Sequence, residues 1–199
     1  MNLQENIKIK GEVSFTITDK EGKVRTHEQP NLITNQGMDF FVSKLFSKDD
    51  TLYRIIGSNP TWNEIASTSD LTNYHIQEIS IGTDSTAAAA TQTWDTQKDA
   101  GVKLTKNITN MKVDDTDEGR GAFFYQANFD SVVTDTLVDS NENELAIKEV
   151  MLLAKYGTFD SPQDSSVDPR IIVSRTVLQQ PFIKYTTDKV AISWKFKLG

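Results

Sequence analysis

The chain has 199 residues and no cysteine, and its 28 Asp and Glu against 21 Lys and Arg give a net charge of −7 at pH 7. The acidic balance argues against a surface that coats nucleic acid or binds an anionic membrane, because both need clusters of basic side chains. The missing cysteines exclude disulfides, thiolate nucleophiles and cysteine-ligated metals, so we expect a binding or assembly protein that uses no cofactor and no metal.

The first predicted element is a β-hairpin. Apolar and polar side chains alternate through residues 7–17, as in a strand with one face on a core and the other in water. The turn-forming residues Asp19–Gly22 follow, and the glycine tolerates the positive φ that tight turns often need. Residues 24–28 then predict the returning strand of an antiparallel pair.

A short amphipathic helix is predicted over residues 38–46. Its apolar residues recur at the spacing i, i+3, i+4, i+7 and i+8, namely Met38, Phe41, Val42, Leu45 and Phe46. Thr34 or Asn35 can cap its start, because a side-chain oxygen accepts a hydrogen bond from an otherwise unpaired backbone N–H. A helix of about three turns is marginal alone in water, so we expect this apolar face to pack on the rest of the fold.

The remaining predicted elements are strands. Period-two alternation or β-branched residues indicate strands over residues 75–81, 103–113, 122–129, 170–178 and 190–198. Trp194 belongs to the alternating apolar face of the last strand, and we assign it to the core. Pro181 is expected to separate the last two strands of this set.

Residues 144–155 are ambiguous between helix and strand. The residue types favour a helix, but the apolar side chains fall on one parity, with Glu149 as the exception. We interpret the segment as a strand.

These elements predict a mainly β protein, an antiparallel β-sandwich of jelly-roll-like type with one short amphipathic helix. We expect a single domain over residues 1–199, because apolar alternation recurs on both sides of every polar stretch. Long loops are expected near residues 47–69, 83–100, 133–143 and 157–169. Loops of this length are usually functional or flexible.

Two tryptophans in the predicted loops are candidate contact residues. Trp62 and Trp94 lie in polar surroundings, where an exposed indole could stack on a sugar ring or anchor a partner subunit. A loop tryptophan more often folds back over the edge of the core, because large exposed apolar surface is unfavourable. Both interpretations stay open at this point.

Three further residues are candidate interface contacts. Tyr125 ends the consecutive apolar run Phe123–Tyr125, which makes both faces of its strand apolar. Such a strand lies between two layers or gives one face to another subunit. Arg54 and Arg120 belong to a scattered set of arginines that could pair with an acidic neighbour, although most surface arginines have no such role.

Little in the sequence points to catalysis. His75 lies at the start of a predicted strand and could act as a general base, but no GxSxG element accompanies it, and a hydrogen-bonded structural histidine is the simpler interpretation. The sequence has no P-loop and none of the GxGxxG, HExxH or CxxC motifs. A pair of catalytic carboxylates cannot be read from sequence, since its members are neighbours in space.

Several short motifs follow one another in a familiar order. Residues 30–37 read PNLITNQG and precede the predicted helix, and residues 79–83 read ISIGT and precede an Ala- and Thr-rich stretch. Residues 147–152 read IKEVML, followed by Arg175, Pro181 and the closing ISWKF at 192–196. In this order the motifs resemble those of small structural proteins from tailed bacteriophages.

The resemblance implies a β-sandwich that assembles into a symmetric oligomer with other virion proteins, without catalytic residues. Met151 stands where the family usually has glycine, and residues 51–72 are longer than the family pattern. The place in the virion therefore stays open between neck or collar, tail, baseplate and capsid decoration.

We expect a non-enzymatic virion protein, made in the host cytoplasm, that binds neither nucleic acid nor membrane directly. The alternatives are a carbohydrate-binding adhesion module that uses the loop tryptophans, and a glycan-cleaving enzyme.

Overall fold

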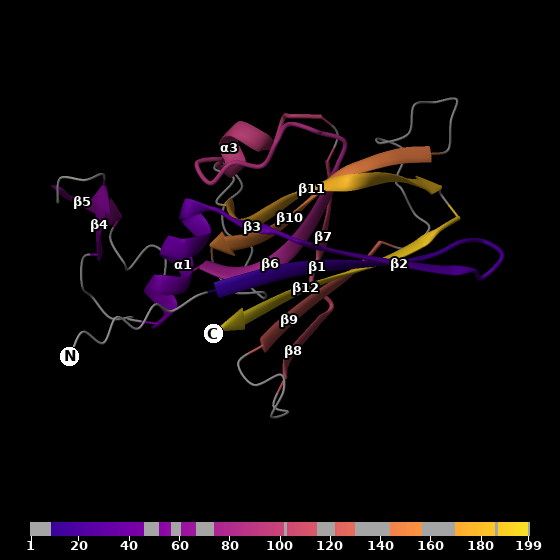
Figure 1. The fold of residues 1–199 in the computed structure, drawn as a ribbon, viewed down its shortest axis with the longest axis horizontal. Coiled ribbons are helices and arrows are strands. Elements are labelled where there is room, and N and C mark those ends of the chain that lie inside the picture. Colours follow the sequence, from indigo (N-terminus) through magenta and orange to yellow (C-terminus); the bar gives the residue numbers. More distant parts are fainter. Residues whose placement is uncertain are drawn as a thin grey trace.

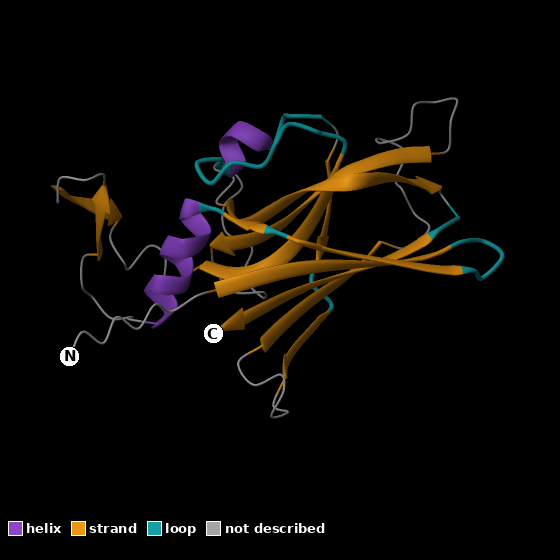
Figure 2. Ribbon diagram, in the orientation of Figure 1, coloured by secondary structure: helices purple, strands orange, loops and turns teal. Residues whose placement is uncertain are grey.

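The computed structural model describes residues 9–45, 52–56, 61–66, 74–101, 103–114, 122–129, 144–156, 170–185 and 187–198. In this part of the chain the protein is mainly β, with two five-stranded antiparallel sheets that face each other and a helix at one end of the pair (Figure 1). The predicted fold class, a β-sandwich, is confirmed. Figure 2 shows how strands dominate the described chain.

The first sheet, called sheet 1, has the strand order β2–β1–β12–β9–β8. Its members are β1 (Ile9–Thr18), β2 (Val24–Pro30), β8 (Asn110–Asp114), β9 (Ala122–Phe129) and β12 (Lys189–Leu198). β1 and β12 pair antiparallel over their whole lengths, with Ile9 opposite Leu198 and Thr18 opposite Lys189. The first and last described strands are therefore neighbours inside the sheet.

The predicted N-terminal hairpin is confirmed by the pairing of β1 with β2. The carboxylate of Asp19 accepts hydrogen bonds from the backbone N–H groups of Glu21, at 3.1 Å, and Lys23, at 2.8 Å. Gly22 adopts a φ of 81°, which costs glycine little because it has no Cβ.

The second sheet, called sheet 2, has the strand order β3–β11–β10–β6–β7. Its members are β3 (Leu32–Ile33), β6 (Tyr74–Gly82), β7 (Lys103–Asn107), β10 (Glu144–Tyr156) and β11 (Arg170–Tyr185). The single strand expected over residues 103–113 is in fact two strands, β7 in sheet 2 and β8 in sheet 1. The chain crosses between the sheets at Ile108, whose side chain is buried in the core.

One apolar core fills the space between the two sheets. The largest fully buried apolar side chains from sheet 1 include Trp194, Phe15 and Phe129, and those from sheet 2 include Ile79 and Leu152. Full burial of each such side chain contributes roughly 1.5–3 kcal/mol, so this layer supplies most of the favourable free energy of folding. The assignment of Trp194 to the core is confirmed.

The predicted helix is α1 (Asn35–Leu45), and Thr34 caps it as expected. The Thr34 hydroxyl oxygen accepts a hydrogen bond from the N–H of Gly37 at 3.0 Å. The buried face differs from the predicted one, because Phe40 is 4% exposed whereas Met38 is 39% exposed. Phe41 packs edge-on against Phe196 of β12, which holds the helix against sheet 1.

The strand interpretation of residues 144–155 is confirmed by β10, and the structure explains why Glu149 breaks the apolar pattern. Leu145 and Ile147 face the core, and a shift in register follows between Ile147 and Glu149. Beyond the shift, Val150 and Leu152 face the core instead. Glu149 thereby belongs to the outer face of sheet 2, where a charged side chain needs a partner.

The expected break at Pro181 is absent, because β11 runs without interruption from Arg170 to Tyr185. Val177 of β11 lies opposite Glu149 of β10. The next paired residue of β11 is Phe182, which lies opposite Ile147. The residues between form a bulge that contains Pro181, and a bulge tolerates proline because proline has no N–H to give to the sheet.

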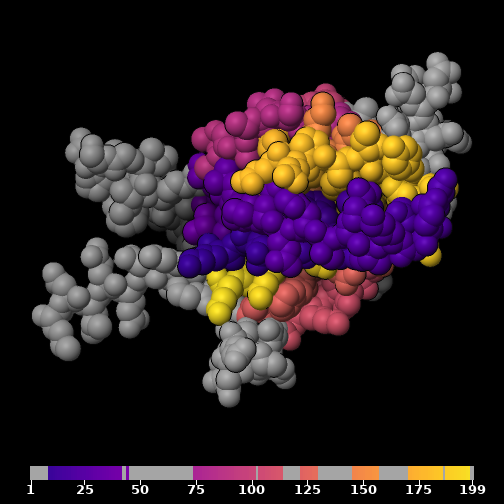
Figure 3. Space-filling model, turned by 45° about the vertical axis from the view of Figure 1, so that its right-hand side comes forward, coloured from indigo at the N-terminus to yellow at the C-terminus, as the bar shows by residue number. Residues whose placement is uncertain are grey.

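Gln29 of β2 joins the two sheets along one side of the sandwich. Its buried side-chain amide donates to the Thr176 hydroxyl at 2.6 Å and to the Val177 carbonyl at 3.0 Å, and it accepts from the N–H of Gln179 at 3.2 Å. Figure 3 shows the indigo N-terminal strands between two groups of yellow C-terminal residues on this side.

The predicted loops have different outcomes. Within residues 47–69 the structure has a two-stranded hairpin of β4 (Leu52–Ile56) and β5 (Thr61–Ala66) instead of a continuous loop. The stretch 83–100 is a loop that includes a second short helix, α3 (Trp94–Gln97), beyond the one helix expected. The predicted loops at 133–143 and 157–169 lie outside the described residues.

No helix among the described residues has the length and apolar character needed to cross a membrane.

Candidate functional site

The loop between β6 and β7 covers the outer face of sheet 2 (Figure 1). Trp94 of α3 is 6% exposed and packs on Met151, Leu153 and Ile172, which form a second, smaller apolar cluster. Of the two interpretations of Trp94, the structure supports the one in which the indole folds back over the core edge. The indole is too buried to stack on a sugar, so this candidate ligand contact is withdrawn.

A buried ionic cluster lies beneath the same loop. The guanidinium of Arg175, with 0% of its side chain exposed, donates to Glu149 and to Asp84, each at 2.8 Å. It also donates to the Thr86 carbonyl and to the Gln92 side-chain oxygen, each at 2.9 Å. Buried charges of this kind are retained when they are paired and hydrogen-bonded.

Lys103 gives the ionic cluster a second cation. Its ammonium pairs with the same carboxylate of Glu149 that Arg175 contacts, and it also donates to the backbone carbonyl of Ala100. Glu149 is fully buried, so its charge is balanced from two sides. Two cations and two carboxylates therefore close the cluster without an unpaired charge among these four groups.

The protonation of Asp84 reflects this setting. Burial raises the pKa of its carboxyl, but the hydrogen bonds from Thr86 and the charges of Arg175 and Lys103 outweigh burial and hold the pKa below its ordinary value. Asp84 is therefore ionised at neutral pH and fixes the start of the loop to β11.

A second ion pair, between two strands of sheet 2, lies beside Trp94 of the loop. Arg170, at the start of β11, donates through Nε to Glu78 of β6 at 2.5 Å. Its guanidinium lies 5.3 Å from the centre of the Trp94 ring, within cation–π distance. The loop is held by the ion pairs of Asp84 and Lys103 near its two ends and by the contacts of Trp94 between them.

Residues of the short sequence motifs contact β11 and β12. Thr34 of NLIT donates through its hydroxyl to the Ile172 carbonyl, and a Cβ at Gly37 would lie 1.9 Å from the Val173 carbonyl oxygen. Glu149, from the IKEVML motif, binds Arg175. In the amide orientation that satisfies its neighbours, Asn31 accepts a hydrogen bond from the indole of Trp194, in ISWKF. These motif residues hold the fold together.

An apolar cavity of about 350 Å³ lies at the helix end of the sandwich. Five aromatic residues line it, from α1 and from sheet 1: Phe40, Phe41, Phe123, Tyr125 and Phe196. The aliphatic side chains of Ile9, Ile76 and Met111 complete the apolar lining. A mostly apolar hollow of roughly 300–1,000 Å³ with a few polar groups is the usual form of a binding site.

Two basic side chains contribute the remaining lining of the cavity. Burial lowers the pKa of Lys44, which lies near the end of α1. Burial, and then the charge of Lys44, lower the pKa of His75 on β6. His75 is therefore mostly neutral at pH 7, whereas an ammonium on Lys44 keeps the positive charge. The geometry offers an apolar space beside a cation.

Tyr125 is the predicted contact residue that the structure places at this cavity. Burial raises the pKa of its phenol, so the hydroxyl stays protonated at neutral pH. The two apolar faces of its strand are also explained, because Phe123 lines the cavity whereas Phe124 lies on the opposite face under the ammonium of Lys195, 5.2 Å from the ring centre.

The other predicted contact residues are not brought together with Tyr125. Arg54 and Trp62 lie on the β4–β5 hairpin, where the structure describes the backbone pairing but not the side chains. Arg120 lies outside the described residues. Phe40 was not predicted as a contact residue, although its place in the apolar pair Phe40–Phe41 was a signal for it.

In the described part of the chain, no three His, Asp or Glu side chains converge as a metal site would require. The sequence matches no family model and no curated protein, and the fold matches no solved structure.

Proposed function

We propose that this chain is a non-enzymatic structural protein of a tailed-bacteriophage virion, which assembles as a symmetric oligomer in the neck or collar, the tail or the baseplate. The observation that carries the proposal is the meeting of the phage-like motifs in the folded chain. Arg175 contacts Glu149, and Asn31 contacts Trp194, across 26 and 163 positions of sequence respectively.

A motif that marks a family is expected to contain residues with structural roles in the fold. Here the motif residues cap α1, pair the buried charges under the loop and join Asn31, just before β3, to β12. Residues with these roles specify an architecture, as the residues of a family motif are expected to do. None of these roles is catalytic, because the charged members are buried and already paired.

The architecture also suits assembly. Rings and shells are commonly built from β-sandwich subunits whose strand edges and loops bridge neighbouring copies. The apolar cavity beside α1 offers such a contact, since exposed apolar surface on a subunit often marks an interface.

The alternative of an adhesion module has lost one of its two tryptophans, because Trp94 is buried. Capsid decoration is a different position for the same kind of subunit, and the experiment below separates it from the neck, tail and baseplate.

A density map of intact particles of the phage that encodes the chain tests the proposal. We expect a subunit of 22.3 kDa with this two-sheet outline in a symmetric layer of the particle. Mass spectrometry of gradient-purified particles gives the copy number, which we expect to be a multiple of that symmetry. Detection of the chain in the infected-cell lysate but not in purified particles would contradict the proposal.

A further inference from the structure

The outer face of sheet 1 carries a group of lysines at the end where β12 finishes. Lys195 of β12 lies opposite Phe124 of β9, and Phe124 lies opposite Lys112 of β8. Lys10 of β1 lies opposite Lys197, which is two residues beyond Lys195 and therefore on the same face. We call Lys10, Lys112 and Lys195, together with Phe124, the lysine patch.

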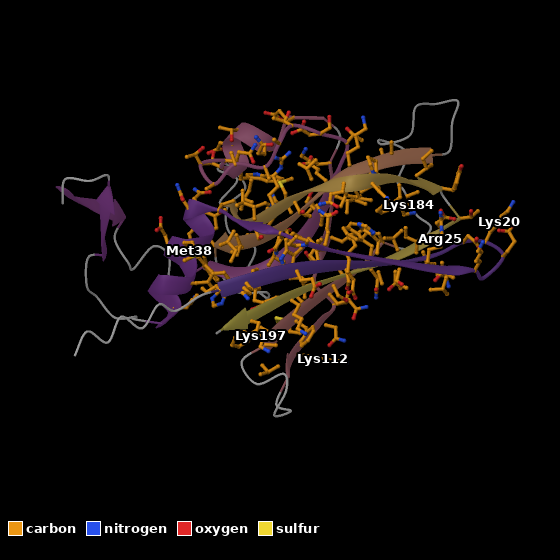
Figure 4. The ribbon with its side chains drawn as sticks, viewed as in Figure 1. Lys20, Arg25, Met38, Lys112, Lys184 and Lys197 are labelled. Carbon is orange, nitrogen blue, oxygen red and sulfur yellow. The ribbon has the colours of Figure 1, made fainter. Side chains whose placement is uncertain are left out.

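A shallow hollow of about 300 Å³ lies on this face of the sheet. Three lysines, one acidic residue, one glycine and one proline line it: Lys10, Lys195, Lys197, Glu12, Gly11 and Pro30. Positive charge therefore exceeds negative charge around the hollow. Figure 4 shows Lys112 and Lys197 at this end of sheet 1, whereas Lys20 lies at the tip of the β1–β2 hairpin.

The positive charge of the lysine patch is not neutralised within the described part of the chain. Lys10 and Lys112 are exposed and make no ion pair with the described residues. Lys195 lies 5.2 Å from the centre of the Phe124 ring, a contact that leaves its charge in place. Glu12, opposite Lys195, offsets one of these charges at most. Like charges on neighbouring strands repel each other, and an anionic partner relieves that repulsion.

The acidic surplus of the chain is concentrated in two other stretches of the sequence. Residues 130–143 contain four acidic residues and no basic one, and residues 157–169 contain three acidic residues and no basic one. Their combined charge of −7 equals the net charge of the whole chain, so acids and bases balance in the rest of the sequence. One chain thus carries both members of a complementary pair of charges.

The described residues that flank 130–143 lie at the opposite end of the sandwich from the lysine patch. Phe129, before the segment, pairs with the start of β12, and Glu144, after it, pairs with Tyr185 at the end of β11. Phe129 is five residues from Phe124 along β9, about 17 Å in a strand. To reach the patch of its own copy and return, the segment would need about ten of its 14 residues in full extension. A neighbouring copy can present the segment without that extension.

We propose that the lysine patch binds the acidic residues 130–143 of a second copy of this chain in a head-to-tail contact. Because the two surfaces differ, each copy keeps one of them for its next neighbour, and a rotation that closes the row gives a ring. This inference rests on the proposed function, and it names the contact that builds the symmetric oligomer.

Sedimentation velocity of the purified full chain tests this contact. We expect reversible self-association at about 50 mM salt and an association at least about tenfold weaker at about 500 mM salt, because salt screens exposed charges. A full chain that stays monomeric at both salt concentrations would overturn the inference, since the patch then has no affinity for a second copy.

The first variant, Lys195→Glu, reverses one charge of the lysine patch. We expect its dissociation constant at low salt to be at least about tenfold higher, because like charges then face each other in the contact. The matched control is Lys98→Glu beside α3, because Lys98 forms a surface ion pair with Asp95, and such a pair contributes little. We expect the control to stay within about twofold of the wild type.

The second variant neutralises the acidic segment, with the changes Asp130→Asn, Asp135→Asn, Asp139→Asn and Glu142→Gln. Its matched control neutralises the other acidic stretch, with the changes Asp160→Asn, Asp164→Asn and Asp168→Asn. We expect only the first set to weaken association at least about tenfold. Mixed with Lys195→Glu, it should form dimers that do not grow, because the mixture holds one intact patch and one intact segment. Equal effects of the two sets, or a mixture without dimers, would refute the head-to-tail contact.

The remaining outcomes separate this inference from the proposed function. Thermal unfolding checks that each variant folds, and Lys112→Glu is the second patch variant if Lys195→Glu is unstable. If the folded patch variant associates as the wild type does, the lysine patch is not the contact. A nucleic acid that co-purifies with the wild type and is lost from Lys195→Glu would replace the second copy as the occupant. Both results overturn the inference and leave the proposed function standing, whereas a chain that self-associates through the patch but is absent from particles contradicts the proposed function alone.

Discussion

At the residue scale, the most constrained side chain of sheet 2 is Arg175. It is fully buried and holds Glu149, Asp84 and two neutral acceptors of the covering loop. Placing an arginine in a low-dielectric interior is unfavourable unless every donor finds a partner, and here the loop supplies those partners. The buried position of Arg175 therefore depends on the loop, which supplies its acceptors, and the position of the loop depends on Arg175, which binds those acceptors.

Replacement of Arg175 by methionine keeps the side-chain length but leaves the carboxylates of Glu149 and Asp84 without their main cation. We expect Arg175→Met to lower the free energy of unfolding by about 3–5 kcal/mol, measured by urea denaturation. The matched control on the same strand is Arg170→Met, because Arg170 also binds a carboxylate but is partly exposed. Equal losses for the two variants would contradict the assigned role of the buried cluster.

The basic pair at the cavity predicts a measurable titration. Because the charge of Lys44 contributes to the lowered pKa of His75, we expect Lys44→Gln to raise that pKa, observed by NMR titration of the imidazole. Lys20→Gln at the hairpin tip is the control and should leave it unchanged. With the folded pKa below 6.5, the stability linked to His75 is full above pH 6.5 and is lost as the pH falls through the folded pKa.

At the element scale, α1 depends on how closely it approaches β11. Gly37 leaves no room for a Cβ, which would lie 1.9 Å from the backbone carbonyl oxygen of Val173. Backbone atoms in the centre of a sheet cannot move aside as the end of a flexible side chain can. The helix would have to shift, and the cavity lining from Phe40 and Phe41 would shift with it.

We therefore expect Gly37→Ala to destabilise the protein more than Gly22→Ala does. Gly22 has a positive φ but open space around it, so its replacement costs about 1 kcal/mol of backbone strain. Thermal unfolding of both variants checks the order. A smaller loss for Gly37→Ala than for Gly22→Ala would show that α1 is not packed closely on β11.

The loop over sheet 2 makes a separate prediction. Trp94→Ala removes the apolar contact that holds the loop. If the whole fold depends on the loop, the free energy of unfolding should fall by about 3–5 kcal/mol. The N–H of Asn35 donates to the Ala90 carbonyl at 2.8 Å, so the loop also contacts the start of α1. We expect hydrogen exchange at Asn35 to accelerate in Trp94→Ala, whereas exchange at Val13 in sheet 1 should change only as global stability does.

The strands could be predicted from the sequence because alternation records which side of a strand meets the core. β1 and β12 follow that pattern closely. The pattern is misleading at β10, where a register shift moves the core face from one parity to the other and leaves Glu149 outside. A sequence carries no direct sign of such a shift.

The candidate site was less predictable because its parts are distant in sequence. The cavity joins residues of α1, β6, β8, β9 and β12, and only folding brings them together. Tyr125 was identified because its strand is apolar on both faces, which is a local signal. The partners of Arg175 could not be identified, because no local pattern shows which of many acidic residues will be its neighbours.

At the scale of the whole molecule, charge is arranged in two ways. The paired charges under the loop are internal and hold sheet 2 to its cover, whereas the acidic surplus of the chain gives the −7 net charge. The surplus of like charge keeps free subunits apart in solution. The proposed assembly therefore needs contacts whose local attraction overcomes this repulsion.

The pairing of β1 with β12 in the interior of sheet 1 predicts a sharp response to shortening. A chain that ends at Asp188 lacks the strand that joins β1 to β9. We expect it to lose cooperative thermal unfolding, followed by circular dichroism. Cooperative unfolding of the shortened chain, at a temperature near that of the full chain, would contradict the observed strand order.

This pairing also sets the order of events on the ribosome. β1 leaves the exit tunnel about 180 residues before β12, so sheet 1 has no centre during most of synthesis, and such long-range pairing is intrinsically slow to form. The cavity is lined by Ile9 at one extreme and Phe196 at the other. Neither sheet 1 nor the cavity is therefore complete until β12 has been synthesised.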